Sequence, residues 1–231
     1  MTTFSASKLL ELWEAGVSRH PIDRALAMLS LADVAGPLAE MPLGQRNWHL
    51  MQLRRARFGD HLSLWLDCSA CGDRMSMEFG VSDLPDTGPG GSRIVVEGHA
   101  FRLANSRDLA NLVSFADPEL AAHTLFLACA ESLETLPQGE ALDQLMDRVG
   151  EAMDAADPWA DLNFEAQCPA CATAHNVPLD IGDLLWQELE IVARQLLDRV
   201  HQLASAYGWS EQAILALSDT RRAAYLARLG T

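Results

Sequence analysis

Apolar and polar residues alternate along this chain with two different periods, and each period predicts one kind of secondary structure. A period of three to four residues, typical of amphipathic helices, covers most of residues 5–58, 106–156 and 183–207. A period of two, typical of half-buried strands, is confined to short stretches between them. The pattern therefore predicts an α+β fold that is mainly α.

Residues that cap helices mark several of the expected ends. The pair Asp117-Pro118 predicts the start of a helix that we expect to run to about Leu136. The longest helix is expected over 183–207, where apolar residues recur along one side. Ser210 and Ser218 are placed to cap two short helices after it. The sequence thus predicts a long C-terminal helix followed by two short ones.

The period of two appears in three places, and each is interpreted as a pair of strands. The segment "RIVVEGHAFRLA" predicts a hairpin that turns at Glu97-Gly98. The other two pairs surround "DCSACGDRMSMEF", which begins at Asp67, and "QCPACATAHNVPL", which begins at Gln167. Each contains a CxxC turn between two alternating stretches and is followed by a helix start. The two units are therefore expected to have the same form.

A shift of one hundred residues aligns the cysteines of these units, Cys68 with Cys168 and Cys71 with Cys171. Four thiolates on two such turns can converge tetrahedrally on one metal ion at about 2.3 Å. Catalytic zinc keeps an open position, whereas four cysteines leave none. We therefore expect a structural Zn²⁺ site and no catalytic residues.

The two cysteine pairs are separated by 96 residues, far more than in a compact zinc ribbon. This spacing predicts a split four-cysteine zinc ribbon, with residues 72–167 inserted between its halves as a hairpin and helices. The expected segments are an N-terminal helical segment at 1–60, the split ribbon at 61–182 and a C-terminal helical segment at 183–231.

Other interpretations of the cysteines remain open. They are a thioredoxin-like redox pair, four free thiols and an iron–sulfur cluster, which also uses four cysteines. His175 lies four residues after Cys171 and is a fifth candidate ligand, although we expect it to face solvent. Cys129 stands apart in an apolar helix, where a buried, inert thiol is expected.

Composition and charge limit the function further. The chain of 231 residues has a net charge of -15, which opposes binding to nucleic acids and to anionic membranes. The cluster Arg54, Arg55 and Arg57 is interpreted as charge at a helix end rather than an anion site. The first residues lack the pattern of a signal peptide, so a cytoplasmic protein is expected. Because nucleophile, zinc-protease and phosphate-loop motifs are absent, we expect no enzyme and no small-molecule substrate.

The two CxxC halves, the segment "GHAFRLANSRDLA" and the terminal block "LASAYGWSEQAILALSDTRRAAYLARL" together resemble a known family. It comprises the zinc-ribbon proteins of phage tails and phage-like contractile injection systems, related to the T4-type baseplate hub assembly chaperones. The resemblance spans residues 43–231. It implies a non-enzymatic assembly or structural role at the baseplate or hub, with baseplate, hub or tail proteins as partners and possible incorporation into a phage-like particle.

The terminal block supplies the candidate partner contacts, which are Tyr207, Trp209, Arg221, Arg222 and Tyr225. Packing of the terminal helices against each other is an equally good explanation for the aromatic residues. Two alternative functions also remain, a zinc-ribbon protein that binds nucleic acid and a redox-sensing zinc regulator.

Overall fold

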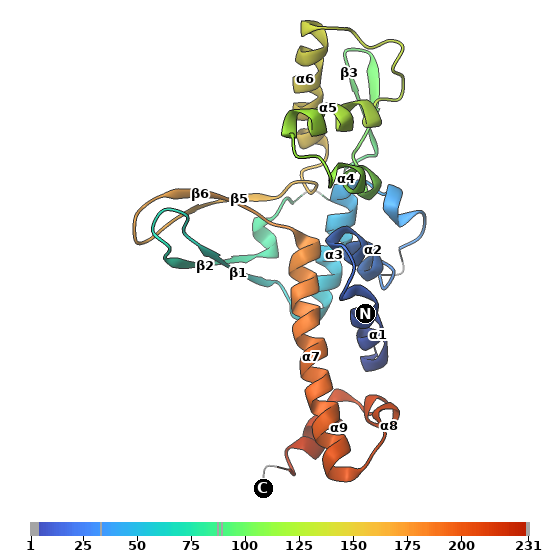
Figure 1. Cartoon of the computed structure of the whole chain (residues 1–231), viewed down its shortest axis with the longest axis vertical. Coiled ribbons are helices and arrows are strands. Elements are labelled where there is room, and N and C mark those ends of the chain that lie inside the picture. Colours follow the sequence, from blue (N-terminus) through green and yellow to red (C-terminus); the bar gives the residue numbers. More distant parts are fainter. Residues whose placement is uncertain (1–4, 33, 87, 89, 230–231) are drawn as a thin grey trace. The chain divides into compact units, whose positions relative to one another are not determined.

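The computed structural model describes residues 5–32, 34–86, 88 and 90–229 of the chain. It confirms the expected class, because helices dominate and the strands form small antiparallel hairpins (Figure 1). The chain divides into two compact units, Met1–Asp33 with Gly182–Thr231, and Val34–Ile181. The expected N-terminal segment at 1–60 is therefore shared between the two units.

The first unit is helical. Its long helix, α7, extends from Ile181 to Tyr207, so that only its first residue lies outside this unit. Two short helices follow α7, as the sequence predicts. Ser210 and Ser218 cap those short helices with their hydroxyl groups. The helices of this unit are α1 (Ala6–Gly16), α2 (Pro21–Leu29), α7 (Ile181–Tyr207), α8 (Glu211–Leu215) and α9 (Asp219–Leu226).

Trp186 of α7 holds the end of α1 and the start of α2 in place. Gly16, the last residue of α1, lies so close to the indole that an added Cβ would sit 2.4 Å from it. The Arg24 guanidinium lies 4.8 Å from the centre of the same ring, and its Nε donates to the Gly16 carbonyl at 2.9 Å. A glycine is required at position 16 because any side chain there would displace the indole.

The second unit contains the strands and the remaining helices. Its helices are α3 (Leu43–Phe58), α4 (Ser106–Leu112), α5 (Pro118–Cys129) and α6 (Glu140–Ala156), with short 3-10 turns η1 (Leu38–Glu40) and η2 (Val81–Asp83). Its strands pair as three separate hairpins, β1 (His61–Asp67) with β2 (Arg74–Gly80), β3 (Arg93–Val96) with β4 (His99–Arg102), and β5 (Asn163–Gln167) with β6 (Ala174–Pro178).

The β3–β4 hairpin packs on α5 and α6 over a small apolar core of Phe101, Phe126, Leu145 and Val149. The hairpin turns at Glu97-Gly98, where both residues have positive φ, as a tight hairpin turn requires. The sequence prediction for this hairpin is therefore confirmed.

Helix α5 starts where the sequence predicts, with the Asp117 side chain capping it, but the expected end near Leu136 is wrong. The helix stops at Cys129, and Ala130 adopts an extended conformation. Ala130 then forms a β-bridge with Phe101, and the Glu131 amide donates to the Ala100 carbonyl at 3.0 Å. Pairing with the β3–β4 hairpin thus replaces the last turns of the expected helix.

Candidate metal centre

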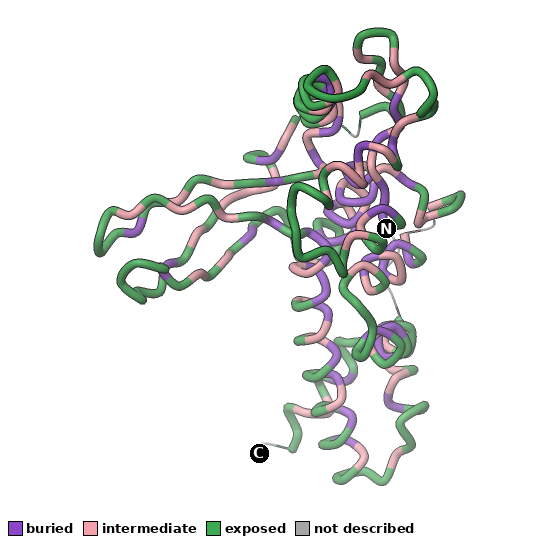
Figure 2. The backbone as a smooth tube through the Cα atoms, turned by 45° about the horizontal axis from the view of Figure 1, so that its top comes forward, coloured by how far each residue is buried: buried purple, intermediate pink, exposed green. Residues whose placement is uncertain are grey.

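Two hairpins that are far apart in sequence lie side by side in the second unit, β1–β2 and β5–β6 (Figure 1). Exposure alternates along their strands, which gives each hairpin one partly buried face (Figure 2). On these faces the rings of Phe79 and Phe164 lie 4.5 Å apart, which joins one hairpin to the other. The period of two in the sequence therefore marks the contact between the hairpins.

The turns at the ends of the two hairpins have the same hydrogen bonds. In each, the amide of the first cysteine donates to the carbonyl five residues later, and the amide four residues later donates back to that cysteine. In the first turn, the Cys68 amide donates to the Asp73 carbonyl and the Gly72 amide donates to the Cys68 carbonyl, both at 2.8 Å. In the second turn, the Cys168 amide donates to the Thr173 carbonyl at 2.9 Å and the Ala172 amide donates to the Cys168 carbonyl at 2.8 Å. The repeat seen in the sequence is thus a repeat of backbone structure.

The backbone also turns with the same handedness after each CxxC. Gly72 has a φ of 75° and Ala172 a φ of 60°, both in the left-handed region. Glycine adopts this conformation without strain, whereas alanine pays a steric cost because of its Cβ. The second turn keeps the geometry of the first despite that cost.

The four cysteines of the repeat come together at the ends of the hairpins. Sγ of Cys68 lies 3.6 Å from Sγ of Cys171, Sγ of Cys71 lies 3.7 Å from Sγ of Cys168, and all four sulfurs lie within 4.8 Å of one another. A tetrahedral ion with metal–sulfur bonds of about 2.3 Å needs sulfurs about 3.8 Å apart. The cluster therefore has the dimensions of a site for a single metal ion.

These distances also distinguish a site for one ion from a disulfide and from an iron–sulfur cluster. The sulfurs are much farther apart than the roughly 2.05 Å of a disulfide, and all four cysteines are free. An iron–sulfur cluster places several irons and sulfides between its cysteines, which needs more room than this group offers. Each short sulfur contact joins one hairpin to the other, so an ion bound here would link both halves of the repeat.

His175 and Met75 occupy equivalent positions in the two hairpins, and both lie beside cysteines of the cluster. Nε2 of His175 is 3.3 Å from Sγ of Cys68, and Met75 is buried with Cys68 and Cys168. The expectation that His175 faces solvent is therefore wrong. The signal that would have found it is the alternation of β6, which places His175 on the same face as Val177.

The thiols of the cluster differ in acidity. The Thr173 hydroxyl, 3.2 Å from Sγ of Cys171, and the Thr173 amide lower the pKa of the Cys171 thiol to about 6. The Asp73 amide lowers the pKa of the Cys71 thiol, but contacts with the neighbouring sulfurs, first that of Cys171, raise it overall to about 12. The Cys171 thiolate thus forms readily, and its negative charge makes the Cys71 thiolate harder to form. A bound cation removes this repulsion between thiolates.

Cys129 takes no part in this cluster. It is fully buried in α5, and burial raises the pKa of its thiol to about 11. A thiol in this state is a poor nucleophile. The expected burial of this cysteine is confirmed, and the raised pKa is in keeping with an inert thiol.

The aromatic candidates for partner contact pack against one another in the first unit. Tyr207 stacks on Trp209 with ring centres 4.8 Å apart, and Tyr225 meets Trp209 edge-on at the same distance. Gly208, which lies between Tyr207 and Trp209 in the sequence, has a φ of 66°. This conformation reverses the chain so that the rings of Tyr207 and Trp209 stack. Tyr207 keeps 36% of its surface exposed, so packing and partner contact are compatible there.

The two neighbouring arginines of α9 differ sharply. Arg221 is exposed, whereas Arg222 is only 3% exposed. The Arg222 guanidinium donates to the carbonyls of Ile214, Leu215 and Leu217 at the end of α8, and it pairs with Asp219. Arg222 therefore joins α8 to α9 and is not available for a partner.

Two of the three arginines at the end of α3, Arg54 and Arg55, are also engaged locally. Arg54 is 3% exposed and donates to the carbonyls of Gly59 and His61, while Arg55 pairs with Asp60. These contacts support the interpretation as charge at a helix end rather than an anion site.

Comparisons with protein-family models, curated proteins and solved structures found no match. Within the part of the chain that the structure describes, no helix combines the length and the apolar character needed to cross a membrane.

Proposed function

We propose that Cys68, Cys71, Cys168 and Cys171 bind one Zn²⁺ ion with a structural role. The observation that supports this is the set of four sulfurs within 4.8 Å of one another, contributed equally by two hairpins. Four thiolates complete the tetrahedral coordination that zinc prefers and leave no position for a substrate or water. The ion would fasten the ends of the two hairpins, which otherwise rely on small apolar contacts such as Phe79 with Phe164.

The metal and its role are tested together. Elemental analysis of the purified full chain should find one zinc per chain in a colourless protein, whereas iron would give a coloured one. A strong chelator should lower the melting temperature, and re-addition of Zn²⁺ should restore it. The C68S/C171S variant should lose the ion and the response to chelator, while C129S, which alters a cysteine outside the cluster, should keep both. A metal-free wild-type protein with unchanged stability would contradict the proposal.

We further propose that the chain is a non-enzymatic assembly or structural factor for the baseplate or hub of a phage tail or phage-like contractile injection system. Its support is the resemblance of the CxxC halves and of the terminal block at 203–229 to that family. A closed metal site between two hairpins, together with helical segments that offer aromatic side chains, suits an interaction protein better than an enzyme.

Co-purification from the native host tests this role. The tagged full chain should recover tail, hub or baseplate proteins, identified by mass spectrometry. The R221A variant, which removes an exposed arginine without touching the fold, serves to locate the contact on the terminal helices. Recovery of nucleic acid in place of such proteins would favour the alternative of a nucleic-acid-binding zinc ribbon, although the acidic charge opposes it.

A redox-sensing role has one supporting observation of its own. Cys71 and Cys171 are exposed, while Cys68 and Cys168 are buried. An oxidant can therefore reach two of the four sulfurs directly. Release of the ion by mild peroxide, reversed by a thiol reductant and Zn²⁺, would support this alternative, whereas retention of the ion would remove it.

A further inference from the structure

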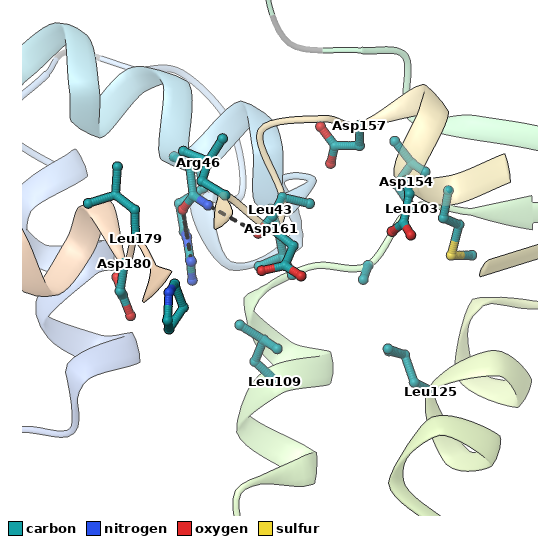
Figure 3. A pocket seen from close by; sticks show the side chains of 16 residues that line it. Leu43, Arg46, Leu103, Leu109, Leu125, Asp154, Asp157, Asp161, Leu179 and Asp180 are labelled. Carbon is teal, nitrogen blue, oxygen red and sulfur yellow. Dashed lines mark hydrogen bonds between the residues drawn. The ribbon is translucent and has the colours of Figure 1, made fainter. Parts of the chain in front are cut away.

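A cavity of about 440 Å³ lies in the second unit, bounded by α3, α4, α5, the end of α6 and the segments that flank β5 and β6 (Figure 3). This volume is within the range of small-molecule and side-chain binding pockets. Most of its wall is apolar and comes from leucines of different elements, among them Leu43, Leu103, Leu109 and Leu125. The wall can therefore contact an aliphatic chain along its length.

The charged groups of the cavity are unbalanced. Four aspartates line it, Asp154, Asp157, Asp161 and Asp180, against one cation, Arg46. Among the described residues, no ion pair joins Asp154, Asp157 or Asp161 to a basic side chain. The sequence supplies no local compensation, because residues 108–180 contain fourteen acidic residues and a single basic one, Arg148, which pairs with Glu97. The cavity therefore favours a positively charged ligand and disfavours an anion.

Arg46 does not compensate the charge of Asp154, Asp157 and Asp161, because its guanidinium is hydrogen-bonded to other groups. The side chain is only 6% exposed, and it donates to Asn47 Oδ1 at 2.9 and 3.0 Å and to Ser106 Oγ at 3.3 Å. Asn47 is held in turn by the carbonyl of Trp159 at 2.8 Å. This network holds the guanidinium against neutral acceptors, and within the described part of the chain no ion pair joins it to Asp154, Asp157 or Asp161.

One carboxylate oxygen of the cavity has no hydrogen-bond donor. Asp157 is 4% exposed, and its Oδ2 accepts from the Gly44 amide at 2.9 Å. Its other oxygen, Oδ1, is buried without a partner. Buried carboxylate oxygens are nearly always hydrogen-bonded, so an unpaired one in the wall of a preformed cavity indicates a missing donor.

We propose that this cavity binds the side chain of an arginine from a partner protein. The aliphatic part of the arginine would lie along the leucine wall, and the guanidinium would be held by Asp154 and Asp161, with Asp157 behind them. Arginine suits the site better than lysine because its planar guanidinium presents five donors to carboxylates and is less strongly hydrated. The cavity would take such a side chain whether or not the partner belongs to a baseplate.

Titration of the ¹⁵N-labelled full chain with N-acetyl-arginine amide tests the proposal. The matched control probe is N-acetyl-citrulline amide, which has nearly the same shape but no charge. We expect the arginine probe to shift the amide signals of Leu43, Leu109 and Asp154. The citrulline probe should bind with a dissociation constant at least about tenfold higher. Equal shifts with both probes, shifts confined to other residues, or none at concentrations on the order of 10 mM would overturn it.

A pair of charge variants separates the cavity from general attraction to an acidic protein. D154N/D161N neutralises two exposed aspartates of the cavity and should weaken binding of the arginine probe by about tenfold or more. E134Q/E140Q removes the same charge from exposed positions outside the cavity and should leave binding unchanged. Both variants should retain the dispersed spectrum of the wild type. An equal effect of the two variants would contradict a specific site.

Discussion

Nε2 of His175, on the second hairpin, lies 3.3 Å from Sγ of Cys68, on the first. Each hairpin thus supplies two cysteines to the cluster, and one of them also supplies an imidazole that contacts the other hairpin's cysteine. Met75, the equivalent residue of the first hairpin, is apolar and belongs to the same buried cluster as Cys68 and Cys168. The two halves of the repeat therefore share a backbone plan but surround the sulfurs with different chemistry.

The first prediction concerns this contact. Outer groups that hydrogen-bond to metal ligands typically contribute roughly 10- to 100-fold to metal affinity, so H175A should weaken zinc binding by about that factor. Competition with a chromophoric chelator measures the affinity. H201A, at an exposed position of α7, is the control and should bind zinc as the wild type does. Unchanged affinity in H175A would show that the contact does not tune the site.

The second prediction concerns the left-handed residue after the second CxxC. A172G should stabilise the protein by roughly 0.5–1 kcal/mol, because relief of the Cβ strain exceeds the added freedom of glycine in the unfolded chain. A170G, in the same turn but without a positive φ, should instead lower stability. Urea unfolding of the zinc-loaded proteins measures both. Destabilisation by A172G equal to that by A170G would contradict this account.

The hairpins and their cysteine turns could be predicted from sequence because their signals are local. Each consists of a period of two, a CxxC turn and a second period of two within about a dozen residues. The face of each strand was harder to assign, and His175 was placed in solvent although its neighbour Val177 points to the same side. The end of α5 was missed because Ala130 pairs with Phe101, a partner about thirty residues away.

The leucine-walled cavity could not be predicted for the same reason. Gly44 and Asp157 are separated by 113 residues, and neither belongs to a motif that indicates the other. The composition of the acidic stretch around Asp154, Asp157 and Asp161 does not distinguish a solvated face from the wall of a cavity. Only the fold shows that Asp157 turns inward to the start of α3, while Asp154 and Asp161 stay exposed at the cavity.

The third prediction concerns the close approach of the Asp157 side chain to Gly44 at the start of α3. A Cβ at Gly44 would lie 1.7 Å from Oδ1 of Asp157, so G44A should destabilise the protein by about 1–3 kcal/mol despite the better helix propensity of alanine. G150A, in α6 with open space around it, is the matched control and should stabilise by up to about 1 kcal/mol. Thermal unfolding distinguishes the two signs.

A double variant identifies the cause of the G44A effect. If the clash with Asp157 is responsible, D157A should relieve most of the loss in the G44A background, although D157A alone removes a hydrogen bond to the helix start. Additive losses in G44A/D157A would place the strain elsewhere.

The fourth prediction concerns pH. Burial raises the pKa of the Asp157 carboxyl above its ordinary 3.8, against the opposing effect of the Gly44 amide. Folding therefore favours the protonated form, and its contribution to stability is complete below about pH 3.8 and is lost as the pH rises through the higher folded pKa. D157N, which cannot ionise, should gain stability relative to the wild type as the pH rises from about 3.8 through the raised folded pKa, and the gain should level off above it.

Melting temperatures of D157N and the wild type across this range test the prediction. D161N removes an exposed carboxylate of the same cavity and is the matched control, because the trend is attributed to the burial of Asp157 and not to the loss of a charge from the cavity. A constant difference between D157N and the wild type at every pH would mean that Asp157 ionises in the folded protein as it does in the unfolded chain.

The fifth prediction separates the two arginines of α9. R222A removes a buried guanidinium and leaves the carbonyls of Ile214, Leu215 and Leu217 without that donor, so it should lower the free energy of unfolding by about 2 kcal/mol or more. R222K should lie between, because one ammonium group cannot reproduce the planar set of donors. R221A, at the exposed neighbouring position, should change stability by less than about 0.5 kcal/mol.

If R221A nevertheless reduces recovery of partner proteins at full stability, the contact surface includes the exposed side of α9. Equal destabilisation by R221A and R222A would contradict the division of roles, because only Arg222 is buried against the end of α8.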